Sequence, residues 1–355
     1  ALWETISWNA FHDIICGTLE DRAYREALRR NKVAERRAEA ALQRAAVRCA
    51  RFVRRRQGGR LSVFNPLPYP REEVIELPPS RGKGESILRV KVPPASVVPL
   101  FSCAVASSTR DHLTARPDSL ENRLLCADFA ADGTIRRLLD KQTGITFSPF
   151  DSCPDAPGML NFFRQPDGGD LWSHYCRPAN GSLLYTAPQR DPMPPSSVEL
   201  LRRGGVASKA LDAEAMELPV IRLVESGPER ATLEIARRTP RLVTRVSLCA
   251  GEKMLRFSTR LTPYGRHHRW RVAFPTGVPR GRIRFSIPCG FLTRPEGEYA
   301  AQGWVDYADQ RKGLCLLNRG LPGANVTGGI MMLSLFRAVA MDSMDRRPWY
   351  EEGVE

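Results

Sequence analysis

A long segment near the start of the chain contains neither proline nor glycine. Within residues 19–57, apolar positions follow one another in alternating steps of four and three, which places them on one face of a helix. These positions are Ala38, Leu42, Ala45, Cys49 and Phe52. We therefore predict a single helix over residues 19–57. Because its apolar stripe is thin, the helix should pack in a small helical bundle or against another domain.

The composition changes after residue 60. Proline and glycine become frequent, and short β-branched or apolar runs alternate with turn signals. The run LLCADFAADGTIRRLL, for example, predicts two strands around a turn at Asp132 and Gly133. Many short strands at regular spacing favour an antiparallel β-sandwich. We predict an α+β, mostly β fold, with a helical connector domain at residues 1–60 and a large β-sandwich region at residues 61–355 that is truncated at its C-terminus.

Bulk composition indicates an ordinary globular protein. Hydrophobic residues make up 42% of the 355 positions and charged residues 26%. No run approaches the roughly 18 apolar residues of a membrane span, so we expect no membrane association. The nine cysteines form no C-x-x-C pair, which argues against a zinc finger and a disulfide framework. We expect reduced thiols and a cytoplasmic location. The chain starts in the middle of a pattern, which suggests a fragment.

The net charge of +14 raises the alternative of nucleic-acid binding. Residues 22–60 carry fourteen basic side chains against three glutamates, which leaves a net charge of +11. However, 46 of the 53 basic residues are arginine, a bias that extends along the whole chain. Aromatic residues are nearly absent from the segment, and no nucleic-acid motif occurs. We therefore predict a solvated helix face and no specific nucleic-acid partner.

The stretch WNAFHDIICGT, residues 8–18, places His12 and Asp13 side by side among apolar residues. On a helix, adjacent residues point about 100° apart, so we do not expect a simple acid/base pair. Imidazole is a good zinc ligand, but zinc needs about four ligands, and no second histidine lies nearby in the sequence. The alternative is a structural histidine packed against Trp8, with Asp13 capping a helix or pairing with an arginine.

Two other segments are candidates for ligand contact. Residues 153–195 are rich in proline, glycine and aspartate, which predicts irregular, ligand-facing backbone. Within them QPDGGDLWSHY combines acids with aromatic residues, and a surface loop anchored by Trp172 is the alternative. In YGRHHRW, His267 and His268 would point to opposite faces of a strand, so a polar hairpin end is expected rather than a metal site.

The segment around His12 resembles glycoside hydrolase family 38 α-mannosidases, at the junction between their catalytic domain and central helical domain. The family pattern N-Q-F-H-D-[IL]-[LI]-x-G-[TS] is kept in FHDI and GT, whereas Ala10 replaces Gln and Cys16 stands where many members have Pro. Further blocks that look like the family follow in order and span most of the chain. They are VFNPLPYPREEVIELP, LENRLLCADFAADGTIRRLLDKQTG, IPCGFLTRP, GWVDYADQRKGLCLLNRG and IMMLSLFRA.

The resemblance implies a role for each of the two residues. His12 would be one ligand of a single divalent metal, usually zinc, and Asp13 would contact hydroxyls of a bound mannose. The other metal ligands, the nucleophilic Asp and the acid/base residue would lie in an upstream domain that this sequence lacks, so it contributes no catalytic residue of its own. The intact enzyme would hydrolyse α-mannosidic bonds of glycans or oligosaccharides by a retaining mechanism, with two carboxyls ~5 Å apart. The chain alone would be inactive; a non-catalytic carbohydrate-binding or interaction module is the alternative.

Overall fold

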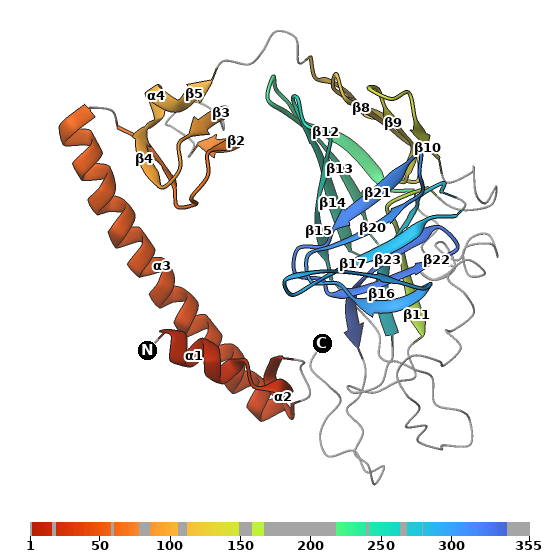
Figure 1. The fold of residues 1–355 in the computed structure, drawn as a ribbon, viewed down its shortest axis with the longest axis horizontal. Helices are drawn as coiled ribbons and strands as arrows, with labels where there is room; N and C mark the ends of the chain where they lie inside the picture. The colour runs from red at the N-terminus through yellow and green to blue at the C-terminus, as the bar shows by residue number, and fades with distance from the viewer. Residues whose placement is uncertain are drawn as a thin grey trace. The chain divides into compact units, whose positions relative to one another are not determined.

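The computed structural model describes residues 2–15, 19–57, 60–77, 86–105, 112–148, 158–166, 218–238, 241–262, 268–278 and 280–338. The chain divides into two compact units. The first comprises Ala1–Leu113 together with Glu225–Ala231 and Cys249–Gly251, and the second comprises the remaining residues. Figure 1 shows that helices α1, α2 and α3 come first in the chain and that strands follow, with the short helix α4 among them.

The helices of the first unit are α1 (Leu2–Asn9), α2 (His12–Ile15), α3 (Asp21–Gln57) and α4 (Leu100–Cys103). Helix α3 is continuous over 37 residues, so the predicted helix at residues 19–57 is confirmed with a start two residues later. It carries three arginines in its last turn, where cations interact favourably with the helix dipole. Helix α1 packs along α3, and α3 also contacts strands β1 and β4.

The face that α3 buries differs from the predicted stripe. Ala27, Ala34 and Val53 are the buried residues of the helix, whereas Leu42 and Phe52 are 62% and 63% exposed. The reason is that α3 has partners near its ends, α1 on one part and the β1 and β4 strands on another. Helical periodicity correctly predicts a helix, but it does not say which part of the apolar surface a neighbour covers.

The strands of the first unit form two small antiparallel sheets. One pairs β1 (Ser62–Asn65) with β4 (Ser96–Pro99), and the other has the order β2-β3-β5. Strands β2, β3 and β5 span Arg71–Leu77, Ser86–Val92 and Ala104–Val105. Val90, Val92 and Cys103 form the buried core, and side chains from β1, β2, β4 and α4 pack against it.

Most of the described part of the second unit is antiparallel β-structure, which confirms the mostly β fold class. Two five-stranded sheets have the orders β10-β9-β8-β7-β6 and β11-β16-β23-β22-β19, and two four-stranded sheets have the orders β12-β13-β14-β15 and β18-β17-β20-β21. The ends of β12, β13 and β14 within Glu225–Ala231 and Cys249–Gly251 are assigned to the first unit. Their bounds are β6 Thr114–Arg116, β7 Ser119–Glu121, β8 Leu125–Phe129, β9 Ile135–Asp140, β10 Thr146–Phe147, β11 Asn161–Pro166, β12 Val220–Ser226, β13 Arg230–Arg237, β14 Leu242–Cys249, β15 Leu255–Leu261, β16 His268–Pro275, β17 Arg282–Ile287, β18 Gly290–Arg294, β19 Gly297–Ala300, β20 Trp304–Ala308, β21 Gly313–Leu317, β22 Gly323–Thr327 and β23 Ile330–Ala338.

The turn predicted at Asp132 and Gly133 joins β8 to β9. Gly133 has a φ of 79°, in the left-handed region that glycine adopts without strain. The Asp132 carboxylate accepts hydrogen bonds from the backbone N–H of Thr134 at 2.9 Å and from its hydroxyl at 2.7 Å. The hairpin signal in the sequence is therefore confirmed, and its physical cause is local.

The segment predicted as a loop at residues 153–195 contains a strand. Asn161–Pro166 forms β11, which pairs with β16 because an apolar run at its start can join the buried sheet. Trp172, the rest of QPDGGDLWSHY after Pro166, and His267 lie outside the described residues.

All six cysteines that the structure describes are free thiols. Within the same residues, no helix is long and apolar enough to cross a membrane.

Candidate metal and sugar site at His12 and Asp13

His12 and Asp13 form the first turn of the short helix α2. Backbone hydrogen bonds from Ile14 and Ile15 to the carbonyl of Phe11, at 3.0 and 2.9 Å, close this turn. Both side chains are accessible, with exposed fractions of 79% for His12 and 40% for Asp13. The pair therefore lies on the surface of the first unit, where a ligand can reach it.

The two side chains lie closer together than helical geometry predicts. His12 Nε2 is 3.5 Å from Asp13 Oδ2, because exposed side chains on one turn can rotate toward each other. This distance exceeds the 2.7–3.2 Å of an N–H···O hydrogen bond, so the contact is an electrostatic one. The ring beside His12 is that of Phe11, at 4.2 Å between centroids, whereas Trp8 faces Arg30.

A buried asparagine holds the segment that leads to His12. Asn9, the last residue of α1, donates from Nδ2 to the carbonyl of Ala27 at 3.2 Å and to Oδ1 of Asn31 at 2.6 Å. Both acceptors belong to α3. The long helix thus serves as the support against which α1 is fixed, and α2 follows after the turn at Ala10 and Phe11.

The donor set at this place is incomplete for a catalytic metal. Zinc in catalytic sites has three protein ligands as a rule, and His12 and Asp13 offer one imidazole and one carboxylate. Among the residues that the structure describes, no group of three or more His, Cys, Asp or Glu could hold a metal ion. The described residues therefore do not fit a complete metal centre by themselves.

Large apolar side chains around the pair are exposed. They are Trp3, Ile6, Trp8, Phe11 and Ile15, all on α1, α2 or the turn between them. Several large apolar side chains exposed on one short segment favour an interaction site over a solvated surface. These exposed side chains lie on the same segment as His12 and Asp13, which by themselves provide too few ligands for a catalytic metal.

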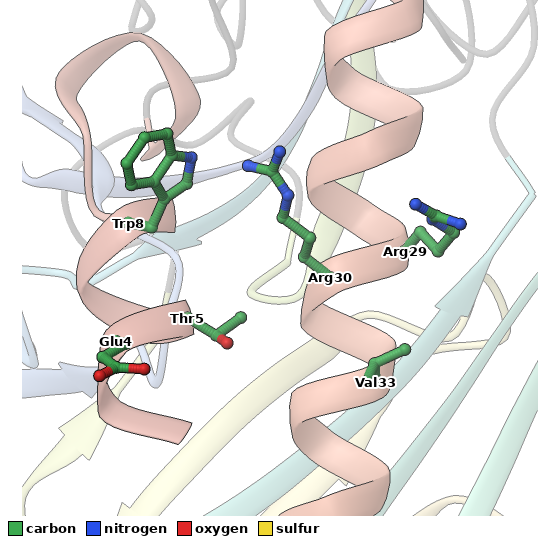
Figure 2. A pocket seen from close by; sticks show the side chains of 6 residues that line it. All are labelled: Glu4, Thr5, Trp8, Arg29, Arg30 and Val33. Carbon is green, nitrogen blue, oxygen red and sulfur yellow. The ribbon is translucent and has the colours of Figure 1, made fainter. Parts of the chain in front are cut away.

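A groove between α1 and α3 was not predicted from the sequence. It has a volume of ≈ 670 Å³ and is lined by Glu4, Thr5, Trp8, Arg29, Arg30 and Val33. Figure 2 shows the Trp8 indole and the Arg30 guanidinium facing each other from the two helices, and Arg30 Cζ lies 5.8 Å from the ring centroid. Trp8 and Arg30 are far apart in the sequence, so no local pattern could have linked them.

Comparisons with known proteins find the same family that the sequence resembles. Residues 203–345 match the Glycosyl hydrolases family 38 C-terminal domain. The chain is 25% identical to human Alpha-mannosidase 2C1 and 24% identical to the mouse protein of the same name, in each case over 95% of this chain. It spans only 31% of the length of these curated relatives.

Solved structures with a similar fold come from Enterococcus faecalis. An α-mannosidase from strain V583 superposes with a TM-score of 0.63 at 17% identity, covering 96% of this chain and 47% of that one. A protein in the glycosyl hydrolase family 38 superposes with a TM-score of 0.59, also at 17% identity, covering 96% and 48%. The chain is therefore similar to the α-mannosidases of glycoside hydrolase family 38, and its residues 203–345 match the C-terminal domain of that family.

Proposed function

We propose that this chain forms part of a metal-dependent retaining α-mannosidase that acts on mannose-containing glycans or oligosaccharides. In this proposal His12 is one ligand of a divalent metal, zinc above all, and Asp13 accepts hydrogen bonds from mannose hydroxyls. The observation that carries the proposal is the accessible His12–Asp13 pair at the end of an anchored helix, within a motif that resembles family 38.

The catalytic carboxylates and the remaining metal ligands belong, in this proposal, to polypeptide outside the 355 residues. Two observations support this. The curated relatives are about three times as long as the matched segment, since it spans 31% of them. The apolar surface around His12 is exposed, and further polypeptide would cover it. The chain alone is then expected to lack hydrolase activity.

Each residue has a defined task in the complete site. The imidazole of His12, in its neutral form, supplies a nitrogen lone pair, and the Phe11 ring at 4.2 Å limits the orientations of the histidine ring. Asp13 is 40% exposed and, when ionised, has oxygen lone pairs for sugar hydroxyls. A bound divalent metal would supply Lewis acidity and hold adjacent hydroxyls of the sugar.

The test uses the protein extended to the length of its relatives. Hydrolysis of an aryl α-mannoside and bound metal, measured by mass spectrometry, are followed in His12→Ala and Asp13→Asn. We expect His12→Ala to lose both metal and activity, and Asp13→Asn to keep the metal but raise KM. His112→Ala, which alters another exposed described histidine, is the matched control and should change neither quantity. Full metal occupancy in His12→Ala would rule out the assigned ligand.

The alternative is a non-catalytic carbohydrate-binding or interaction module. It predicts that the 355-residue chain binds mannosides alone and that His12→Ala leaves this binding unchanged. Mannoside binding by the isolated chain that depends on His12 would count against the module and in favour of the enzyme.

A further inference from the structure

One face of the sheet β18-β17-β20-β21 carries an ordered set of aromatic and polar side chains. Alternate residues of a strand point to opposite faces, so the strand registers define two rows that cross the sheet on one side. The first row is Phe291, Ser286, Trp304 and Leu317, and the second is Thr293, Arg284, Asp306 and Cys315. The residues between them in sequence, Phe285 and Val305, are buried and point to the other face, as does Ile283, which precedes Arg284.

The first row forms an aromatic surface. The rings of Phe291 and Trp304 lie 6.0 Å apart between centroids, and Phe291 is 54% exposed. Ser286 is buried, and its hydroxyl accepts hydrogen bonds from the N–H groups of Gly303 at 2.7 Å and Trp304 at 2.9 Å. These bonds fix the start of β20 and with it the backbone that carries the indole.

The second row supplies a donor and an acceptor beside the rings. Arg284 donates from Nε and Nη2 to the same oxygen of Asp306, Oδ2, at 2.9 and 2.6 Å. The second carboxylate oxygen, Oδ1, accepts no hydrogen bond from a described residue. The Arg284 guanidinium also lies 5.9 Å from the centroid of the Phe291 ring. The pair is therefore held in place next to the aromatic surface, and one carboxylate oxygen remains available.

We propose that this face binds a hexopyranoside. A pyranose ring has an apolar face of C–H groups and a rim of hydroxyls, so it needs an exposed aromatic plane with hydrogen-bonding groups at its edge. The exposed Phe291 ring provides the plane, and the Trp304 ring lies beside it at an interplanar angle of 46°. Asp306 accepts from a hydroxyl, and Arg284 donates to one. A hydrophobic protein partner fits less well, because it would have to remove water from the charged pair.

The identity of the sugar rests on the proposed function. If the protein acts on mannose-containing glycans, this face would hold a mannosyl residue of such a glycan. The binding chemistry itself requires only a pyranose with suitably placed hydroxyls. Failure of the substrate assignment and failure of the site can therefore be told apart.

The experiment measures binding of methyl α-mannoside, methyl α-glucoside and methyl α-galactoside to the 355-residue chain by ligand-observed NMR. We expect a Kd on the order of 1 mM for the mannoside, as befits a ligand of about a dozen heavy atoms on an open surface. Phe291→Ala and Asp306→Asn should each weaken binding about fivefold or more, and Trp304→Phe should retain most of it. Phe101→Ala removes another exposed phenylalanine and should have no effect.

Each result of the binding experiment bears on the site, on the identity of its sugar or on self-association of the chain. Binding of the glucoside or galactoside but not the mannoside, with the same variant effects, supports the site and contradicts mannose as its sugar. No binding of any hexoside to the folded wild-type chain overturns the proposal, as does binding that Phe291→Ala/Asp306→Asn leaves intact in a variant with unchanged circular dichroism. Self-association of the chain that Phe291→Ala abolishes would also overturn it, since a second copy would then occupy the face.

Discussion

Asn9 Nδ2 donates a hydrogen bond to Asn31 Oδ1 at 2.6 Å, which ties the end of helix α1 to helix α3. The two residues are 22 positions apart, and the same amide nitrogen also reaches the carbonyl of Ala27. His12 follows this anchor by three residues. A buried polar contact therefore helps to fix the position of the candidate metal ligand, while the large apolar side chains nearby are exposed.

Asn9→Ala is expected to destabilise the packing of α1 on α3. The substitution removes two hydrogen bonds, and we expect a loss of about 1–2 kcal/mol in the free energy of local unfolding. Amide hydrogen exchange of α1 measures it directly. Lys32→Ala, an exposed change on α3, is the control and should leave exchange in α1 unaltered. Equal protection of α1 in Asn9→Ala and wild type would show that apolar contacts alone hold the helix.

Asp140 is expected to make stability depend on pH in the acid range. Burial raises the pKa of this carboxyl, but hydrogen bonds from Lys253 and Thr143, each at 2.6 Å, and from the backbone of Gln142 outweigh it and lower the pKa to about 2. A depressed folded-state pKa stabilises the protein above the unfolded value of 3.8. The contribution of about 2 kcal/mol should therefore disappear as the pH falls from about 4 to about 2.

Urea denaturation of wild type and Asp140→Asn at a series of pH values measures this contribution. The two proteins should differ most above pH 4 and converge near pH 2, because the protonated carboxyl then resembles the amide in charge. A difference that stays constant over the whole range would mean that Asp140 acts through neutral hydrogen bonds only.

The buried ion pair between Arg89 and Glu229 should be costly to break from one side. Arg89 Nε lies 2.8 Å from Glu229 Oε2, and the exposed fractions of the two side chains are 14% and 4%. Arg89→Met deprives a buried carboxylate of this ion pair, so we expect a loss of about 3 kcal/mol in stability. Arg71→Met breaks the exposed pair with Glu73 and should cost less than about 1 kcal/mol.

A double-mutant cycle with Glu229→Gln tests this explanation. If the loss of this ion pair at a buried carboxylate dominates, Arg89→Met/Glu229→Gln should be more stable than Arg89→Met alone. Strictly additive effects of the two substitutions would contradict a direct interaction.

Gly133 and Gly144 allow a matched test of backbone strain against steric clash. Both have positive φ, at 79° and 72°. A Cβ on Gly133 would lie 2.6 Å from Ile235 Cγ2, whereas nothing lies within 4 Å of a Cβ on Gly144. Gly144→Ala should cost about 1 kcal/mol from strain, and Gly133→Ala about 1–3 kcal/mol more from overpacking. Thermal unfolding of the two variants measures the difference; equal Tm values would show that Ile235 yields without cost.

Local sequence patterns predicted the elements well. The segment without proline or glycine became α3, and the Asp-Gly turn became the hairpin of β8 and β9, because both signals act within a few residues. Prediction failed where burial or strand pairing depends on another element of the fold. Leu42 and Phe52 were expected to be covered and are exposed, and β11 lies in a predicted loop. The role of His12 and Asp13 in a site stays a prediction, and the 3.5 Å approach of their side chains did not follow from helical spacing.

The sequence alone therefore determined the order and type of the elements, the family resemblance and the two residues that carry it. The tertiary structure decided which surfaces are buried and which distant residues meet: Asn9 with Asn31, Trp8 with Arg30, and Arg284 with Asp306 beside the Phe291 ring. The physical reason is the sequence separation over which each kind of interaction acts. Helix and turn propensities depend on near neighbours, whereas these contacts join residues that only sheet registers and helix packing bring together.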